Sequence, residues 1–326
     1  MLLLVTGATG KVGTNLIAHI LADGRWKDAH IRALCHQRMF PETDRVEVVK
    51  GNISDRESVD RAMAGVTHVV HLATCKETPE IVMDVAVKGL FWLLESFRQS
   101  KTAEQFILIG GDASIGHFFY RHDGPITELT PHQAYPGCYA LSKVLEEVLL
   151  AQFVIQYGIN GSCLRAPWIM EKDDFRYSLS FGDDVFGGPD WKTLVPADVA
   201  KKCQREGTIP ILHCVDGQPL KRNFVHVADL VNAISAALDN PAAQGKLYNI
   251  CMDEPVDYGS VARHLNKTRG LASIDIPSTY HSTWLDNSRA KLELGWRPNY
   301  DLEKLIDGAW NYKRALTDPR KIWYPG

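Results

Sequence analysis

The sequence predicts an α/β fold, a doubly wound parallel sheet of the Rossmann type with a smaller C-terminal lobe. Three observations lead to this prediction. Short apolar segments alternate with segments of helical spacing through the first half of the chain, which is typical of parallel strands covered by helices on both faces. Glycines at positions 7, 10 and 13 directly follow the first apolar segment. No Gly-, Ser- or Pro-rich linker separates the two halves, so we expect one compact body.

The elements of the first half are expected in strict alternation. The expected strands are 2–6, 30–35, 46–51, 67–74, 105–110 and 161–166, and the expected helices are 11–24, 81–99 and 139–157. Because crossovers between parallel strands are right-handed, this order winds helices onto both faces of one sheet.

After Pro167 the pattern loosens, and residues 168–207 combine aromatic and acidic residues with turn signals. A strand at 209–213 and a helix at 227–238 follow and are expected to rejoin the sheet. The run YNI at 248–250, a helix near 258–269 and the segment 301–316 complete the chain. We therefore expect a Rossmann domain in 1–166, rejoined by about 209–247, and a substrate lobe in 167–208 and 248–326. The lobe should cover the carboxyl edge of the sheet, where such sheets bind ligands.

Composition excludes several classes of protein. The net charge of -3 over 326 residues argues against a nucleic-acid surface, which normally carries a basic stripe. The seven cysteines are scattered and form no CxxC, so we expect neither disulfides nor a metal site, and a reducing cytoplasm. The apolar run at the start is too short for a signal peptide, and no run of eighteen apolar residues predicts a membrane span.

The segment TGATGKVG joins the first strand to the first helix. Gly7 permits a tight turn, Gly10 lets the backbone approach a pyrophosphate, and Gly13 lets the helix pack closely on the strand. The helix N-terminus then faces the anion. This segment predicts a dinucleotide cofactor, NAD or NADP.

The end of the second strand bears on the choice between the two cofactors. An acid that binds the adenosine ribose is expected about twenty residues after the glycines, but the segment IRALCHQR contains none. Arg32, His36 and Arg38 are candidates to meet a 2′-phosphate, or are ordinary surface residues. The sequence leaves NAD and NADP both open.

The segment YALSK places Tyr139 and Lys143 one turn apart at the start of a helix, hence on one face. A tyrosine that exchanges a proton near neutral pH needs help to ionise, and a neighbouring ammonium supplies it. The pair predicts an acid/base centre beside the cofactor.

With these motifs the chain resembles the extended short-chain dehydrogenase/reductases, the family of nucleotide-sugar epimerases and dehydratases. The resemblance covers nearly the whole length. Its motifs are TGATGKVG (6–13), GNISD (51–55), HLA (71–73), VKG (87–89), YALSK (139–143), LRAPWI (164–169), RNFVHVADLV (222–231) and DNSRAKLELGWRP (286–298).

The resemblance implies a role for each matching residue. The cofactor contacts are Gly7, Gly10, Lys11, Val12 and Gly13 at the pyrophosphate, Asn52 and Ile53 at the adenine, and Leu72, Ala73 and Thr74 at the nicotinamide. Tyr139 is the catalytic acid/base, and Lys143 binds the nicotinamide ribose and stabilises the tyrosinate. Arg222 contacts the diphosphate of a nucleotide sugar. In the family, the helices matching 81–99 and 139–157 form a four-helix dimer interface, which implies a homodimer.

The chain departs from the family at the substrate. Gly111 stands where the family carries a hydroxyl side chain, and Trp168 takes a place often held by an asparagine. The polar residues near Gly111 are Asp112, Ser114 and His117, which either contact substrate or shape the loop. The glycine pair at 110–111 indicates that substrate or backbone packs closely there. We therefore expect the side chain added in Gly111→Ser to hinder binding and raise KM.

Three functions fit these residues. The first is an epimerase or dehydratase that oxidises a sugar or nucleotide-sugar carbinol transiently, without net reduction of the cofactor. The second is a net dehydrogenase or reductase of a small hydroxy or carbonyl compound. The third is a non-catalytic NAD(P)-binding protein, against which the presence of both Tyr139 and Lys143 argues.

Overall fold

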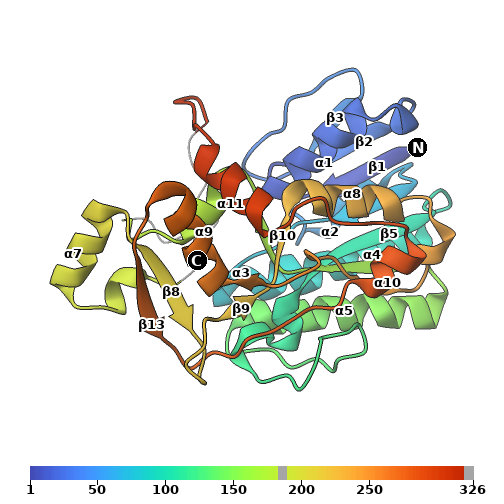
Figure 1. Ribbon diagram of the computed structural model, residues 1–326. Coiled ribbons are helices and arrows are strands. Elements are labelled where there is room, and N and C mark those ends of the chain that lie inside the picture. Colours follow the sequence, from blue (N-terminus) through green and yellow to red (C-terminus); the bar gives the residue numbers. More distant parts are fainter. Residues whose placement is uncertain (183–188, 319–326) are drawn as a thin grey trace.

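The central element of the fold is a parallel sheet of seven strands in the order β11-β6-β5-β4-β1-β2-β3. The computed structural model describes residues 1–182 and 189–318 (Figure 1). The strands are β1 (Leu2–Thr6), β2 (His30–Cys35), β3 (Val46–Lys50), β4 (His68–His71), β5 (Gln105–Gly111), β6 (Gly161–Ala166) and β11 (Leu247–Asn249). This confirms the doubly wound sheet, whose strand order reverses between β1 and β4. The crevice at that reversal is the usual ligand site of such sheets.

Helices cover both faces of the sheet, as Figure 1 shows. On one face α1 (Lys11–Ala22) packs against α8 (Val227–Ala237). On the other lie α2 (Arg56–Met63), α4 (Gly89–Gln99) and α5 (Cys138–Tyr157). The helix expected at 81–99 is present in three parts: α3 (Pro79–Val82), a π-helical segment η2 (Met83–Lys88) and α4. Each face has its own apolar core, one under α1 and α8 and one under α2, α4 and α5.

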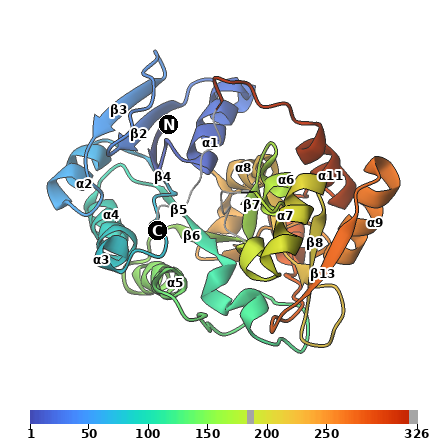
Figure 2. The same cartoon turned by 90° about the vertical axis from the view of Figure 1, so that its left-hand side faces the viewer.

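The lobe has a third apolar core and lies beside the sheet in Figure 2. Its strands are β7 (Trp168–Met170), β8 (Ile209–His213), β9 (Lys221–Arg222), β10 (Phe224–His226), β12 (Val256–Asp257) and β13 (Ser273–Pro277). Its helices are α6 (Asp174–Ser178), α7 (Ala197–Glu206), α9 (Tyr258–Arg269) and α11 (Leu302–Asn311), and α10 (Ser288–Glu293) returns to β11. Short 3₁₀ turns are η1 (Gly24–Trp26), η3 (Asp112–Ile115), η4 (His117–Phe119), η5 (Trp191–Thr193) and η6 (Pro241–Ala243).

The strand at 209–213 does not rejoin the sheet, which corrects the expected domain boundaries. β8 pairs in parallel with β13 along its full length, and its apolar side chains belong to the core of the lobe. The helix α8 does rejoin. The strand β11, most of which was expected in the lobe, also belongs to the sheet and takes the edge beside β6. Occupation of that edge by β11 leaves β8 to the lobe.

In the described residues no helix is long and apolar enough to cross a membrane. Within the same residues no group of three His, Cys, Asp or Glu side chains is placed to hold a metal ion. All seven cysteines are described, and each carries a free thiol.

Candidate active site

The loop between β1 and α1 forms a tight backbone cradle at the carboxyl edge of the sheet. Gly7 has a φ of +66°, and a Cβ on it would lie 2.8 Å from the backbone nitrogen of Ala73. A Cβ on Gly13 would lie 2.4 Å from the carbonyl oxygen of Gly7. Gly10 then leads into α1 without a capping side chain. The cradle and the helix N-terminus together fit a pyrophosphate group.

Lys11, expected at the pyrophosphate, uses its ammonium elsewhere. Its Nζ lies 2.6 Å from Oδ2 of Asp174 and donates to the carbonyl oxygen of Ile169 at 2.9 Å. Both charged side chains are nearly buried. Lys11 therefore ties the glycine loop to the lobe. The candidates to hold a pyrophosphate are then the backbone of the cradle and Val12.

The nicotinamide side of the crevice is held by Thr6 at the end of β1. Its Oγ1 accepts hydrogen bonds from the backbone nitrogens of Leu72 (3.1 Å) and Ala73 (3.2 Å) and lies 2.8 Å from Nδ1 of His71. Burial lowers the pKa of His71 to about 3, so the ring is neutral. These bonds fix the backbone that leads to the exposed Thr74, the segment that is expected at the nicotinamide.

The structure does not bring Arg32 to the cofactor. Its guanidinium lies 2.7 Å from Oε1 of Glu47 and donates to the carbonyl oxygen of Ala62. Arg32 also stands three residues before the end of β2, roughly 10 Å short of the sheet edge at the usual rise of a strand. His36 and Arg38 follow the strand end and are exposed, so they remain the candidates for a 2′-phosphate.

Asn52 and Ile53, which are expected at the adenine, lie just beyond β3. Oδ1 of Asn52 accepts from the backbone nitrogen of Ser54 at 3.0 Å, which shapes the turn. Ile53 is buried, and a Cβ on Gly89 would lie 3.0 Å from its Cγ1. The glycine of the VKG motif therefore exists to let α4 approach this turn.

Tyr139 and Lys143 lie together at the start of α5, below the end of β5. A Cβ built on Gly111 would stand 3.6 Å from both Oη of Tyr139 and Cδ of Lys143. The buried Nζ of Lys143 is 2.7 Å from Oε2 of Glu146. Burial opposes the charge of Lys143, but the attraction of Glu146 and Tyr139 outweighs it, and the pKa of Lys143 is raised. The ammonium therefore stays protonated beneath the phenol.

A second ammonium beside Tyr139 was not predicted from the sequence. Nζ of Lys76 lies 4.0 Å from the centre of the Tyr139 ring, which is within the range of a cation–π contact. Lys76 comes from the loop after β4, five residues beyond His71. A lysine so soon after the HLA motif is the signal that sequence reasoning missed.

Ser114 is a structural residue, so of the two roles that the sequence leaves open for it, substrate contact and loop shaping, the structure supports the second. Its Oγ is fully buried and donates to Oε1 of Glu147 at 2.8 Å. Glu147 also binds Arg165 (2.6 Å) and His132 (2.9 Å). Although burial opposes ionisation, these hydrogen bonds lower the pKa of Glu147 to about 2. Ser114 is thus committed to a buried ionic network behind the site.

The two glycines at the end of β5 serve different ends. A Cβ on Gly110 would lie 2.8 Å from Sγ of Cys163 and 3.1 Å from Oε1 of Glu147, so the core requires glycine there. A Cβ on Gly111 would meet Tyr139 and Lys143 only at ordinary contact distance. Of the two glycines, Gly111 is therefore the one that leaves space beside Tyr139 and Lys143.

Trp168 on β7 and Arg222 on β9 are in contact within the lobe. The guanidinium of Arg222 lies 4.2 Å from the ring of Trp168 and 4.5 Å from that of Phe118. In the described residues no carboxylate forms an ion pair with Arg222. The charge of Arg222 also acts on the buried Asp112, which follows Gly111. Trp168 therefore holds the arginine flat and leaves its charge for an anion.

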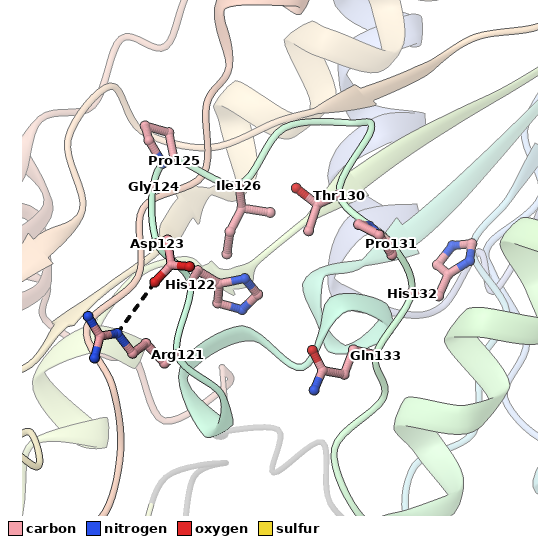
Figure 3. A pocket seen from close by; sticks show the side chains of 10 residues that line it. All are labelled: Arg121, His122, Asp123, Gly124, Pro125, Ile126, Thr130, Pro131, His132 and Gln133. Atoms are coloured by element: carbon pink, nitrogen blue, oxygen red, sulfur yellow. Dashed lines mark ion pairs between the residues drawn. The ribbon is translucent and has the colours of Figure 1, made fainter.

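A separate surface pocket of about 380 Å³ lies on the loop between η4 and α5 (Figure 3). Residues 121–126 and 130–133 line it, and Arg121 and Asp123 pair across 3.5 Å at one side. The pocket includes none of the residues predicted for the site. We therefore place the chemistry at Tyr139 and not at this pocket.

The fold and the site define the class of the protein. A glycine cradle at the switch point of a doubly wound sheet, with a tyrosine and a lysine one turn apart beside it, belongs to dinucleotide-dependent enzymes of the short-chain dehydrogenase/reductase class. Residues 3–251 match the NAD dependent epimerase/dehydratase family, and the chain belongs to that family. It is an NAD(P)-dependent enzyme of the extended type, and the predicted resemblance is confirmed.

Curated relatives include both reductases and epimerases. An anthocyanidin reductase of Arabidopsis thaliana is 26% identical over 91% of this chain and 92% of its own length. A UDP-glucose 4-epimerase of Lacticaseibacillus casei is 24% identical over 96% of each chain. Among solved structures, a short-chain dehydrogenase/reductase superfamily protein from Agrobacterium tumefaciens with bound NAD has a TM-score of 0.79 at 22% identity, covering 95% of this chain and 96% of its own.

Proposed function

We propose that the protein is an NAD(P)-dependent epimerase or dehydratase that oxidises a carbinol of a nucleotide sugar transiently. The observation that carries this proposal is the placement of Arg222. It lies on the lobe side of the cleft, is held flat by Trp168 and Phe118 and, among the described residues, forms no ion pair with a carboxylate. A diphosphate bound there would lie across the cleft from Tyr139.

The residues of the site support this chemistry. The glycine cradle fits NAD, which when bound supplies the hydride acceptor and later the donor. Tyr139, beside the ammonium of Lys143, is the group that accepts the proton of the carbinol hydroxyl as the carbonyl forms. Return of the proton from Tyr139 restores a hydroxyl in the epimerase reaction, while a dehydratase eliminates water before the hydride returns. Lys76 adds positive charge over the Tyr139 ring.

The test is product analysis with UDP-glucose, UDP-glucuronate and dTDP-glucose in the presence of NAD. We expect conversion of at least one of them, seen by anion-exchange chromatography and NMR, without net change of absorbance at 340 nm. Stoichiometric formation of NADH would contradict the proposal, since a net dehydrogenase releases its reduced cofactor.

A net reductase is the second candidate, and an aromatic cluster formed by the loop before α5 together with the lobe favours it. Phe118, Phe119, Tyr135 and Tyr280 contact one another with ring centres 4.5 to 5.2 Å apart, next to Arg222. A flat phenolic substrate would suit such a surface, and one relative is an anthocyanidin reductase. Oxidation of NADPH at 340 nm with a flavonoid would select this function.

We further propose a homodimer built on α4 and α5. On α5 the side chains of Leu141, Val148 and Ile155 are 45%, 40% and 73% exposed, and their spacing of seven places them in one stripe. Phe91 of α4 is also exposed. We expect light scattering at micromolar concentration to give twice the mass of the chain, and Val148→Glu to give the monomer. A wild-type monomer at that concentration would contradict the proposal.

We propose that the protein is cytoplasmic, because its cysteines are free thiols. All seven cysteines are free, four of the buried ones in the sheet or the lobe core. Free thiols in this number suit the cytoplasm, where disulfides do not persist.

A further inference from the structure

The substrate side of the cleft contains two buried, ionisable side chains with unused hydrogen-bonding capacity. Asp112 and His117 are only 8% and 7% exposed. Both ring nitrogens of His117 lack a hydrogen-bond partner, and within the described residues no side chain donates a hydrogen bond to the Asp112 carboxylate. The two groups face each other at 3.7 Å, from Nδ1 to Oδ2. Buried polar groups in folded proteins are nearly always bonded, so this pair calls for a partner outside the chain.

The fold holds both groups firmly. Asp112 opens η3 directly after the last residue of β5, one residue from the space beside Tyr139. His117 has a φ of +22°, a conformation that a side chain rarely adopts and that gathers at functional sites. Its ring packs between Phe118 at 4.2 Å and Tyr135 at 5.1 Å. A strained and packed histidine without a hydrogen bond is not explained by the stability of the loop.

The surroundings of the pair leave the Asp112 carboxyl divided between its ionised and its protonated form at neutral pH. Burial raises the pKa of Asp112 to about 7, against the pull of Arg222, Arg165 and Lys76. Burial lowers the pKa of His117 well below its usual value, and Arg222, His122 and Lys76 act in the same direction. Burial raises the pKa of the Cys251 thiol well above its usual value, and the charge of Asp112 acts in the same direction. At neutral pH the imidazole of His117 is therefore neutral. The carboxyl of Asp112 is only partly ionised, and a ligand that donates a hydrogen bond to it would favour the ionised form.

We propose that Asp112 and His117 bind two neighbouring hydroxyl groups of the sugar ring, beside the carbon that Tyr139 oxidises. This inference rests on the proposed function and names the feature of the substrate that the site selects. A hydroxyl both donates and accepts, so a vicinal diol satisfies the carboxylate and the imidazole together. The pair takes over the positioning role of the hydroxyl side chain that Gly111 lacks, and it does so from the next turn of the loop.

The test compares Asp112→Asn and His117→Gln with the wild type and with Glu128→Gln. Glu128 is a partly buried carboxyl that accepts from the backbone nitrogen of Asn249 at 2.9 Å, so its variant controls for loss of a charge alone. Calorimetry measures the affinity for UDP and for UDP-glucose, and kinetics gives KM and kcat on the nucleotide sugar that turns over. The 2-deoxy and 3-deoxy forms of UDP-glucose report the hydroxyl contacts separately.

We expect both variants at the pair to bind UDP as the wild type does, and to bind the nucleotide sugar 10- to 100-fold more weakly. They should also lose discrimination against one deoxy sugar, whereas Glu128→Gln keeps it. The wild-type kcat/KM should fall as Asp112 is protonated below about pH 7, and this limb should be absent in Asp112→Asn.

Two results would overturn the inference. One is Asp112→Asn with wild-type affinity for the complete sugar, and the other is a wild type that binds UDP-glucose no more tightly than UDP. Failure of the proposed function gives a different result, because a protein that binds the sugar through the pair but converts none still shows the deoxy effect. If His117→Gln does not fold, Asp112→Asn alone decides, since it preserves the shape of the side chain.

Discussion

Two buried carboxylates near the end of β5, those of Glu147 and Asp112, differ in their hydrogen bonds and in the direction of their pKa shifts. Glu147 receives hydrogen bonds from Ser114, His132 and Arg165, and its pKa falls to about 2. Asp112 receives none from a described side chain, and burial raises its pKa to about 7. The first carboxylate holds helix α5 to the sheet and completes its bonds within the chain. The second, Asp112, completes no such network within the described residues, which is why we propose it as a ligand contact.

The largest effect is expected on the cleft side, at the reactive phenol. Tyr139→Phe keeps the ring and removes the group that exchanges the proton, so kcat should fall by roughly 10² to 10⁴. Cofactor affinity by calorimetry should stay within a few-fold. Tyr157→Phe, at the exposed end of the same helix, serves as the control. Near-full turnover of Tyr139→Phe would show that other residues carry the chemistry.

Variants in the buried network around Glu147 should change the free energy of unfolding. Arg165→Met leaves Glu147 buried without its main partner, and breaking a buried pair in this way costs about 3–5 kcal/mol of unfolding free energy. Urea unfolding measures the loss. The double variant with Glu147→Leu should recover most of it, because the unpaired charge is gone. Equal stability of Arg165→Met and the wild type would mean that the network does not hold the fold.

The two carboxylates should also give opposite pH dependence of stability. The pKa of Glu147 is lowered in the fold, so its contribution is present above about pH 4.5 and is lost as the pH falls toward 2. The pKa of Asp112 is raised, so stability is highest below about pH 4 and is lost as the pH rises to 7.

Unfolding free energies from pH 3 to 8 compare Glu147→Gln and Asp112→Asn with the wild type. Each variant should remove a few kcal/mol of pH dependence at most, in its own range. Asp112→Asn should be at least as stable as the wild type at pH 8. A clear loss of stability there would assign Asp112 to the scaffold.

The smallest effects are expected at the glycine pair. Gly110→Ala forces Cβ against Cys163 and Glu147 and should cost about 1–3 kcal/mol. Gly111→Ala should change stability by no more than about 0.5 kcal/mol. Gly111→Ser should fold equally well but raise KM, because its hydroxyl enters the space beside Oη of Tyr139. An unchanged KM would show that the substrate does not use this space.

Local patterns in the sequence predicted much of the fold and the centre of the site. The apolar runs gave the six strands of the first half, and the spacing of Tyr139 and Lys143 placed them on one face of α5. Gly7 and Gly13 were expected to need glycine, and the contacts of the cradle confirm it. These features depend on the backbone conformation of a few consecutive residues, so a single sequence is enough to predict them.

The partners of charged side chains were decided by the tertiary structure. Lys11 pairs with Asp174 and Arg32 with Glu47, neither of which follows from motif spacing. Ser114 binds Glu147, whereas among the described residues no side chain donates a hydrogen bond to Asp112, two residues earlier. β8 joins β13 in the lobe because β11 occupies the edge of the sheet. These pairings depend on which side chains, distant in the sequence, the fold brings within about 4 Å of one another. Short sequence motifs do not contain those distances.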